Sequence, residues 1–297
     1  MLILNMGDTE KFFIYLYTPI SDLLLDEILK GLNSFILLIN MAKKKSYDKF
    51  YDEGYKKIYK KINYNDPLCD LGDLTRIRLV EKTINKIKIN KSLDAGCGGG
   101  LFLPILSKYS SKVLGIDISE VALKFAKKRN KYLKLKNVRL KKLSLNKIRT
   151  LKERFDLIIC MEVLEHCEND KEIINNLYNS LSKKGILIIS VPNSSYLLIS
   201  PSNIFEEEDV GHINNYNKKT IKKLLKERFK IKEIISYKTF FLPWIERLNK
   251  KLYFAMKNFK FYLNFLFPIF LNISKIDLFL FRKNEKSDGI FIVCKKS

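Results

Sequence analysis

The strongest chemical signal of this chain is an acid followed by three alternating glycines. A short apolar stretch that predicts a buried strand runs into Asp94, Gly96, Gly98 and Gly100. Glycines in such a turn let the backbone approach a bound molecule closely, because no Cβ stands in the way. Asp117 ends a second predicted strand roughly 20 residues further on, where a carboxylate can accept hydrogen bonds from ribose hydroxyls. This order of elements predicts a nucleoside-binding site.

Two classes of cofactor use this layout, and the residue types separate them. The dinucleotide fingerprint Gly-x-Gly-x-x-Gly needs a third glycine at the position of Leu101. The pattern Asp-x-Gly-x-Gly-x-Gly fits throughout, and it resembles the glycine-rich motif of class I S-adenosylmethionine-dependent methyltransferases. In that family the first acid, here Asp94, faces the cationic amino-acid end of the cofactor. A pyrophosphate would not favour a carboxylate at this place.

The resemblance implies S-adenosyl-L-methionine as the cofactor and also implies which residues bind it. The implied residues are Asp94, Ala95, Gly96, Cys97, Gly98, Asp117 and Ile118. Met161, at the end of a later apolar strand, lies along the cofactor in this superfamily. Arg76 or Arg78 could reach the cofactor carboxylate, because an arginine fork suits that group.

A second motif directly follows Met161. The run Glu162-Val163-Leu164-Glu165-His166 resembles a signature of many class I methyltransferases, among which the ubiquinone-biosynthesis O-methyltransferases are close in pattern. If a helix begins just after Met161, Glu162, Glu165 and His166 share one face, since positions i, i+3 and i+4 are neighbours.

Both histidines of the chain lie beside this expected site, because His212 falls in a loop where relatives often carry Gly-His. Glu162, Glu165, His166 and His212 could hold a divalent cation such as Mg²⁺, which orients and acidifies a hydroxyl. Catalytic candidates are His212, His166 and Glu165, since imidazole titrates near neutrality and can act as a general base. The alternative is that Glu165 and His166 cap the next helix and bind no metal.

Strands and helices alternate through the middle of the chain. The predicted strands are Ser92–Ala95, Lys112–Asp117, Val138–Leu143, Phe155–Met161, Gly185–Pro192, Ile231–Tyr237 and Gly289–Lys295. The predicted helices are Leu101–Tyr109, Glu120–Lys131, Asp170–Leu181 and Lys218–Phe229. Such alternation predicts an α/β fold with a doubly wound, mostly parallel, Rossmann-like sheet of seven strands, the last of them antiparallel.

Residues 91–239 and 286–297 form the predicted core, and three segments surround it. Residues 1–45 are predicted as an amphipathic extension, 46–90 as a helical lid before the core, and 240–285 as a hydrophobic helical insertion. The insertion is dense in aromatic residues and punctuated by lysines, and it has no eighteen uninterrupted apolar residues that would span a membrane. It would contact a membrane interface or hold a hydrophobic substrate, or it would pack on the core as a cap.

The net charge of +23 raises the question of a nucleic-acid partner. Only nine of the 55 basic residues are arginine, so the surface lacks the forked side chains that read phosphate or guanine. A compositional origin of the charge is therefore favoured over a nucleic-acid surface.

Five cysteines without a Cys-x-x-Cys pair predict reduced thiols in a cytoplasmic protein, with contact to the inner face of the membrane as an open alternative.

The sequence thus predicts an S-adenosylmethionine-dependent methyltransferase that methylates an oxygen of a small, lipid-linked or hydrophobic acceptor. An RNA 2′-O-methyltransferase and a non-catalytic nucleoside-binding module stay as alternatives.

Overall fold

The computed structural model describes residues 71–194, 212–237 and 287–296, together with six single positions. These positions are Asp52, Glu53, Tyr55, Lys56, Asn272 and Ile276. All described residues belong to the unit that spans residues 48–297. The predicted extension at 1–45 lies outside the described residues, and so does the insertion at 240–285 apart from two of the single positions.

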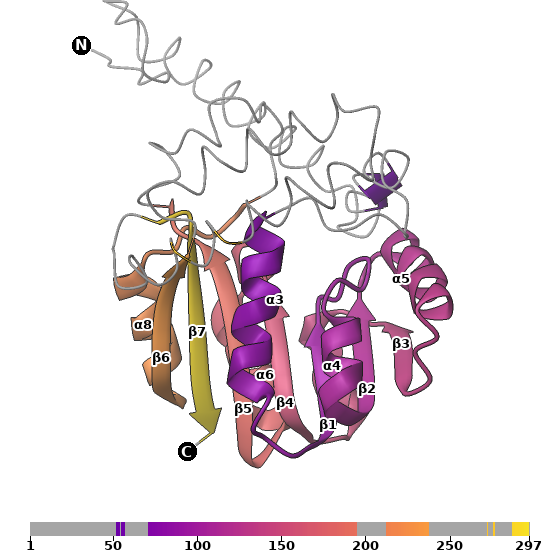
Figure 1. Ribbon diagram of the computed structural model, residues 1–297. Helices are drawn as coiled ribbons and strands as arrows, with labels where there is room; N and C mark the ends of the chain where they lie inside the picture. Colours follow the sequence, from indigo (N-terminus) through magenta and orange to yellow (C-terminus); the bar gives the residue numbers. More distant parts are fainter. Residues whose placement is uncertain are drawn as a thin grey trace, which may run out of the picture. The chain divides into compact units, whose positions relative to one another are not determined.

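A seven-stranded sheet with the order β3-β2-β1-β4-β5-β7-β6 forms the centre of the described part (Figure 1). The strands are β1 (Ile89–Ala95), β2 (Ser110–Asp117), β3 (Val138–Lys142), β4 (Phe155–Met161), β5 (Leu181–Pro192), β6 (Phe229–Tyr237) and β7 (Gly289–Lys296). Strands β1 to β5 pair in parallel, whereas β7 pairs antiparallel with both β5 and β6. The predicted fold, including the antiparallel last strand, is confirmed.

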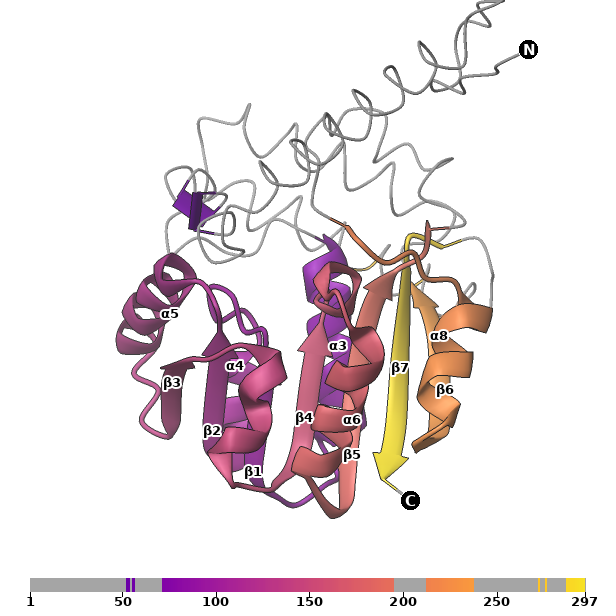
Figure 2. The same cartoon turned by 180° about the vertical axis from the view of Figure 1, so that it is seen from behind.

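Helices cover both faces of this sheet (Figures 1 and 2). One face carries α3 (Leu71–Ile84), α4 (Leu103–Tyr109) and α5 (Glu120–Tyr132), and the other carries the 3-10 helix η1 (Leu145–Leu151), α6 (Asp170–Ser180) and α8 (Lys218–Lys226). Among the described residues, no helix is long and apolar enough to cross a bilayer.

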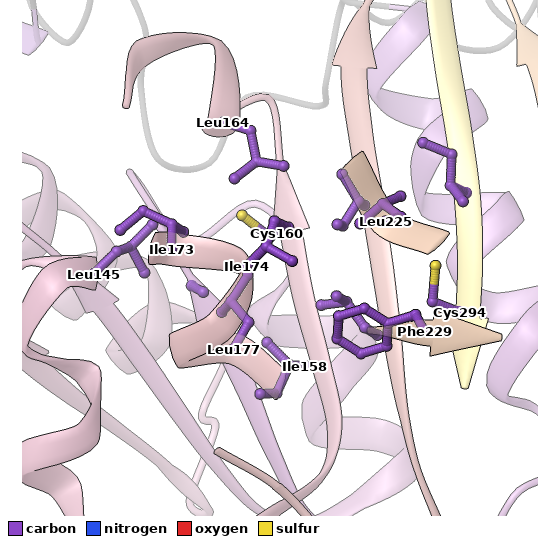
Figure 3. Close-up of a cluster of buried hydrophobic side chains, with 14 of the residues drawn as sticks. Leu145, Ile158, Cys160, Leu164, Ile173, Ile174, Leu177, Leu225, Phe229 and Cys294 are labelled. Atoms are coloured by element: carbon purple, nitrogen blue, oxygen red, sulfur yellow. The ribbon is translucent and has the colours of Figure 1, made fainter. Parts of the chain in front are cut away.

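Each face of the sheet has its own hydrophobic core, because successive residues of a strand point to opposite sides. On β4, Ile158 and Cys160 lie against Ile174 and Leu177 of α6, as Figure 3 shows, while Ile159 belongs to the cluster on the other face. Strands buried on both faces need continuous apolar sequence, which explains why β4 lacks the polar alternation of a half-exposed strand.

Most predicted boundaries agree with the structure within three residues, and the clearest differences are at two turns. Strand β5 begins at Leu181, four residues before the predicted start, because Leu181 is buried and pairs with Phe155 of β4. Helix α8 ends at Lys226, three residues before the predicted end, because the buried Phe229 is the first residue of β6. At both turns a buried tertiary contact extends the strand beyond the local sequence pattern.

Candidate active site

The loop after β1 has a backbone conformation that glycine adopts readily and other residues do not. Gly96, Gly98 and Gly100 have φ angles of +84°, +47° and +80°. A Cβ atom on Gly96 would lie 2.5 Å from Cγ2 of Val163, so the loop contacts the segment after β4 more closely than a side chain would allow. We call this turn of Gly96, Gly98 and Gly100, in which the first two residues are half-buried, the glycine cradle.

A buried carboxyl group, Asp94, lies directly before this loop. Asp94 is 1% exposed, and its Oδ2 atom has no hydrogen-bond partner among the described residues. Burial, followed by repulsion from Asp117, raises the pKa of Asp94 to about 8. A positive charge beside it would compensate the cost of burying the ionised form, so the site suits a cationic group.

The second acid, Asp117, fixes the glycine loop to the start of α5. Its Oδ2 atom accepts a hydrogen bond of 2.8 Å from the backbone N–H of Gly98, and its Oδ1 atom accepts one of 2.8 Å from Ser119. Burial raises the pKa of Asp117, although these two bonds act in the opposite direction. Each carboxylate oxygen keeps a second lone pair, so the group can still accept bonds from ribose hydroxyls.

The remaining predicted cofactor-binding residues lie at the same place. Ala95 and Met161 are buried at the ends of β1 and β4, Cys97 is buried in the loop, and Ile118 is half-buried after β2. Strands β2, β1 and β4 are neighbours, so their carboxyl ends form one continuous edge. Ligands of open α/β sheets bind at this edge.

Two residues of the segment predicted as a lid contact this region. The Tyr55 hydroxyl would lie 2.8 Å from a Cβ atom on Gly98. One carboxylate oxygen of Asp52 accepts hydrogen bonds from the Ser119 hydroxyl and, at 3.1 Å, from the backbone N–H of Val121. Tyr55 and Asp52 therefore contact the glycine loop and the start of α5, whereas α3, which belongs to the same predicted segment, packs on a face of the sheet.

Three of the predicted catalytic and metal-binding residues form a second group. Ligand atoms of Glu165, His166 and His212 all lie within 4.8 Å of one another, and the two imidazole rings are 4.9 Å apart between centroids. Glu165 is 1% exposed, and neither of its carboxylate oxygens has a hydrogen-bond partner among the described residues. Burial and the nearby charge of Glu162 raise the pKa of Glu165 well above its usual range. The group therefore suits a cation, which would compensate the buried carboxylate.

The loop that carries His212 is attached to this group by Asn214, which the sequence analysis did not single out. Backbone N–H groups of Ile213 and Asn214 donate to the Glu165 carbonyl at 2.8 and 2.9 Å. The Asn214 side chain donates to the carbonyls of Leu164 and Cys167 at 3.1 and 2.6 Å. In the sequence, the position two residues after His212 is the signal that could have indicated a role for Asn214.

No helix begins just after Met161, so the condition under which Glu162, Glu165 and His166 would share one helix face is not met. Glu162 has a φ of +53°, which is incompatible with a right-handed helix, and only the 3-10 turn η2 (Leu164–His166) follows. Helix α6 starts later and uses Asn169 as its N-cap, with the side chain accepting from the Glu172 N–H. Glu165 and His166 therefore do not cap this helix, which was the alternative interpretation.

Glu162 does not belong to the group of ligand atoms that lie within 4.8 Å of one another. Its Oε1 atom accepts a hydrogen bond of 3.0 Å from the Tyr237 hydroxyl, and its Oε2 atom is 3.3 Å from Nη1 of Arg76. The side chain of Glu162 is thus bonded to residues of α3 and β6.

Comparison with known proteins identifies the family to which a chain with this site belongs. Residues 88–262, more than half of the chain, match the family model of a methyltransferase domain. The ubiquinone biosynthesis O-methyltransferase of Histophilus somni is 30% identical over 126 residues, which cover 41% of this chain and 53% of that protein. The enzyme of the same name from Coxiella burnetii is 32% identical over 121 residues, with 41% and 51% covered. The chain spans about half the length of the curated relatives it matches.

Solved structures share the fold. Magnesium protoporphyrin IX methyltransferase from Synechocystis PCC 6803, with bound S-adenosylhomocysteine, has a TM-score of 0.54 at 16% identity and covers 84% of this chain and 98% of its own. The N-methyltransferase NodS from Bradyrhizobium japonicum, in complex with the same compound, has a TM-score of 0.50 at 16% identity, with 74% and 85% covered. Together with the family match and the glycine cradle between two buried acids, this shows that the chain belongs to the class I S-adenosylmethionine-dependent methyltransferases.

Proposed function

We propose that this protein transfers a methyl group from S-adenosylmethionine to a hydroxyl oxygen of a small hydrophobic or lipid-linked acceptor. The observation that carries the proposal is the group of Glu165, His166 and His212 at the strand edge beside the glycine loop. A hydroxyl becomes a good nucleophile when its proton is removed, and a base or a bound cation serves this purpose. The O-methyltransferase names of the curated relatives support the same choice of acceptor atom.

The residues around the glycine loop fit the cofactor. When bound, S-adenosylmethionine supplies a methyl group on a positively charged sulfur. In the proposal Asp94 balances the ammonium group and Asp117 accepts hydrogen bonds from the ribose hydroxyls, while the backbone of the glycine loop leaves room between them. Arg76 binds the cofactor carboxylate in this proposal. Arg76 is paired with Glu162, and Glu162 directly follows Met161, one of the proposed cofactor-binding residues.

At the other end of the site, His212 takes the proton of the acceptor hydroxyl, and Glu165 with His166 stabilises the imidazolium that results. The acceptor oxygen then forms a bond to the methyl carbon, while the electron pair of the broken carbon–sulfur bond stays on sulfur. Alternatively, Glu165, His166 and His212 hold Mg²⁺, which lowers the pKa of the hydroxyl. In both cases placement of the two reacting atoms in line supplies much of the rate.

The attachment of the insertion supports a hydrophobic acceptor. The chain leaves the described sheet after Tyr237 and returns at Ser287, and Tyr237 pairs with Gly289 at this end of β7. The Tyr237 hydroxyl contacts Glu162, so both attachment points lie at the edge that carries the site. An insertion rich in aromatic residues that starts and ends here is suited to surround an apolar acceptor, and we propose peripheral membrane contact for the same segment.

The proposal is tested by a transfer assay with methyl-labelled S-adenosylmethionine and lipid extracts, glycans and RNA from the source organism, each with and without a chelator. We expect label in a lipid or other hydrophobic product, with loss of label in Glu165→Gln and His212→Ala. Both variants should still bind S-adenosylhomocysteine in calorimetry, because they do not touch the glycine loop. Loss of transfer with the chelator would assign the cation mechanism.

The other outcomes favour the alternatives. Label confined to RNA, with RNA binding that falls steeply with salt, would identify the RNA 2′-O-methyltransferase, for which the net charge of +23 is the supporting observation. Cofactor binding without transfer to any fraction would identify a non-catalytic module.

A further inference from the structure

A network of polar side chains connects α3, the end of β4 and the end of β6. Nη1 of Arg76 donates to the Tyr237 hydroxyl at 3.2 Å, and that hydroxyl donates to Oε1 of Glu162 at 3.0 Å. The same Nη1 atom lies 3.3 Å from Oε2 of Glu162, and Nη2 of Arg76 is bonded to Asp73. One phenol thus contacts both members of an ion pair, as the acceptor of one bond and the donor of the other.

The centre of the network is largely buried, whereas its two carboxylate side chains are partly exposed, 22% for Asp73 and 29% for Glu162. Tyr237 is 1% exposed, and the Arg76 side chain is 14% exposed. The guanidinium carbon lies 5.8 Å from the centre of the Tyr237 ring. The backbone of Glu162 has a φ of +53°, and its N–H donates to the Ser190 carbonyl at 3.0 Å. An unfavourable backbone angle in a non-glycine residue persists only where the surrounding contacts hold it.

The Tyr237 ring reaches Glu162 only because β7 carries a glycine at the crossing point. Tyr237 is on β6, whereas Glu162 follows β4, and both β7 and β5 lie between them in the sheet. Gly289 pairs with Tyr237, and a Cβ atom on Gly289 would lie 2.2 Å from the Cζ atom of the ring. Any other residue at this position would displace the ring and with it the hydroxyl.

We infer that Tyr237 is a positioning residue for cofactor binding, which holds the Arg76 guanidinium in place at the cofactor end of the site. The inference rests on the proposed role of Arg76 as the ligand of the cofactor carboxylate. Asp73 and Glu162 pair with different nitrogens of the guanidinium. The hydrogen bond to the Tyr237 hydroxyl connects the guanidinium to strand β6. A fixed guanidinium loses less conformational freedom when it binds a carboxylate, which strengthens binding.

The test is a double-mutant cycle on the affinity for S-adenosylhomocysteine, measured by calorimetry with the full chain. Tyr237→Phe removes the hydroxyl and keeps the ring, so we expect the Kd to rise about three- to tenfold. In an Arg76→Ala background the same change should alter the Kd less than about twofold, because residues that act as a unit are not additive. Tyr178→Phe is the matched control, since Tyr178 packs against Phe229 on the opposite face of the sheet.

A second variant, on β7, changes the contact between Gly289 and the Tyr237 ring. Gly289→Ala should weaken binding in the same direction as Tyr237→Phe, because it displaces the ring. An unchanged Kd in Tyr237→Phe, or an equal effect with and without Arg76, would overturn the inference. If Arg76→Ala itself left the Kd unchanged, the proposed role of Arg76 would fail and the inference with it. If the wild-type chain bound no S-adenosylhomocysteine, the proposed function would fail first.

Discussion

The affinity for S-adenosylhomocysteine should rise steeply between pH 6 and pH 7.5, and Asp94 is the reason. In the empty site, burial and the charge of Asp117 raise the pKa of this carboxyl group to about 8. The group is therefore mostly protonated at neutral pH, whereas the ammonium of the ligand favours the ionised form. Binding must release the proton of Asp94, and the cost of this release decreases as the pH rises.

The size of the effect follows from the pKa. Each pH unit below the pKa costs about 1.4 kcal/mol to remove the proton, which is about a factor of ten in the observed Kd. From pH 6 to pH 7 the affinity should therefore rise about tenfold, and from pH 6 to pH 7.5 about twentyfold. Above about pH 8 the dependence should flatten, because Asp94 is then already ionised in the empty site.

Isothermal titration calorimetry at several pH values checks this prediction. Repeating each titration in two buffers with different ionisation enthalpies should show close to one proton released per ligand at pH 6 to 7. Asp94→Asn is the control, because its amide does not titrate, and its Kd should change little over the same range. A wild-type Kd that is independent of pH, or the same slope in Asp94→Asn, would refute the reasoning.

Three further predictions concern stability and the acceptor end of the site. Because the pKa of Asp94 is raised above its unfolded value of about 3.9, its contribution to stability is complete below about pH 4 and is lost as the pH rises to about 8. Urea unfolding of the unliganded chain should show this loss, up to about 6 kcal/mol, and Asp94→Asn should reduce it. Gly96→Ala should destabilise the fold by roughly 1–3 kcal/mol and abolish cofactor binding, because the φ of Gly96 is +84° and the new Cβ would meet Val163. A melting temperature equal to that of the wild type would contradict this prediction. Asn214→Ala should slow methyl transfer about tenfold, because it releases the loop of His212. The Kd for S-adenosylhomocysteine should stay within twofold of wild type. Equal losses of transfer and of cofactor affinity would show that Asn214 acts on the whole fold instead.

Local signals were enough to predict the sheet and to bring the proposed cofactor-binding residues to one edge of it. The apolar run of β4 and the turn chemistry at Gly96 depend on neighbouring residues, and the structure confirms both. The acids at 94 and 117 end two parallel strands, and the carboxyl ends of neighbouring parallel strands must meet at one edge. His212 was predicted beside the site from the resemblance to relatives that carry Gly-His in this loop, and its ring lies 4.9 Å from that of His166, 46 positions earlier in the sequence.

Contacts between distant segments decided the remaining features. The sequence left open whether a helix begins just after Met161, and the positive φ of Glu162 decides against it. This backbone conformation is held by bonds to Ser190, Arg76 and Tyr237, which lie on three other elements. Strand order is not encoded in any local pattern, so the sequence gives no sign that a tyrosine at the end of β6 contacts the end of β4. That contact depends on the order β4-β5-β7-β6 and on a glycine at position 289, and both become meaningful only when the sheet is assembled.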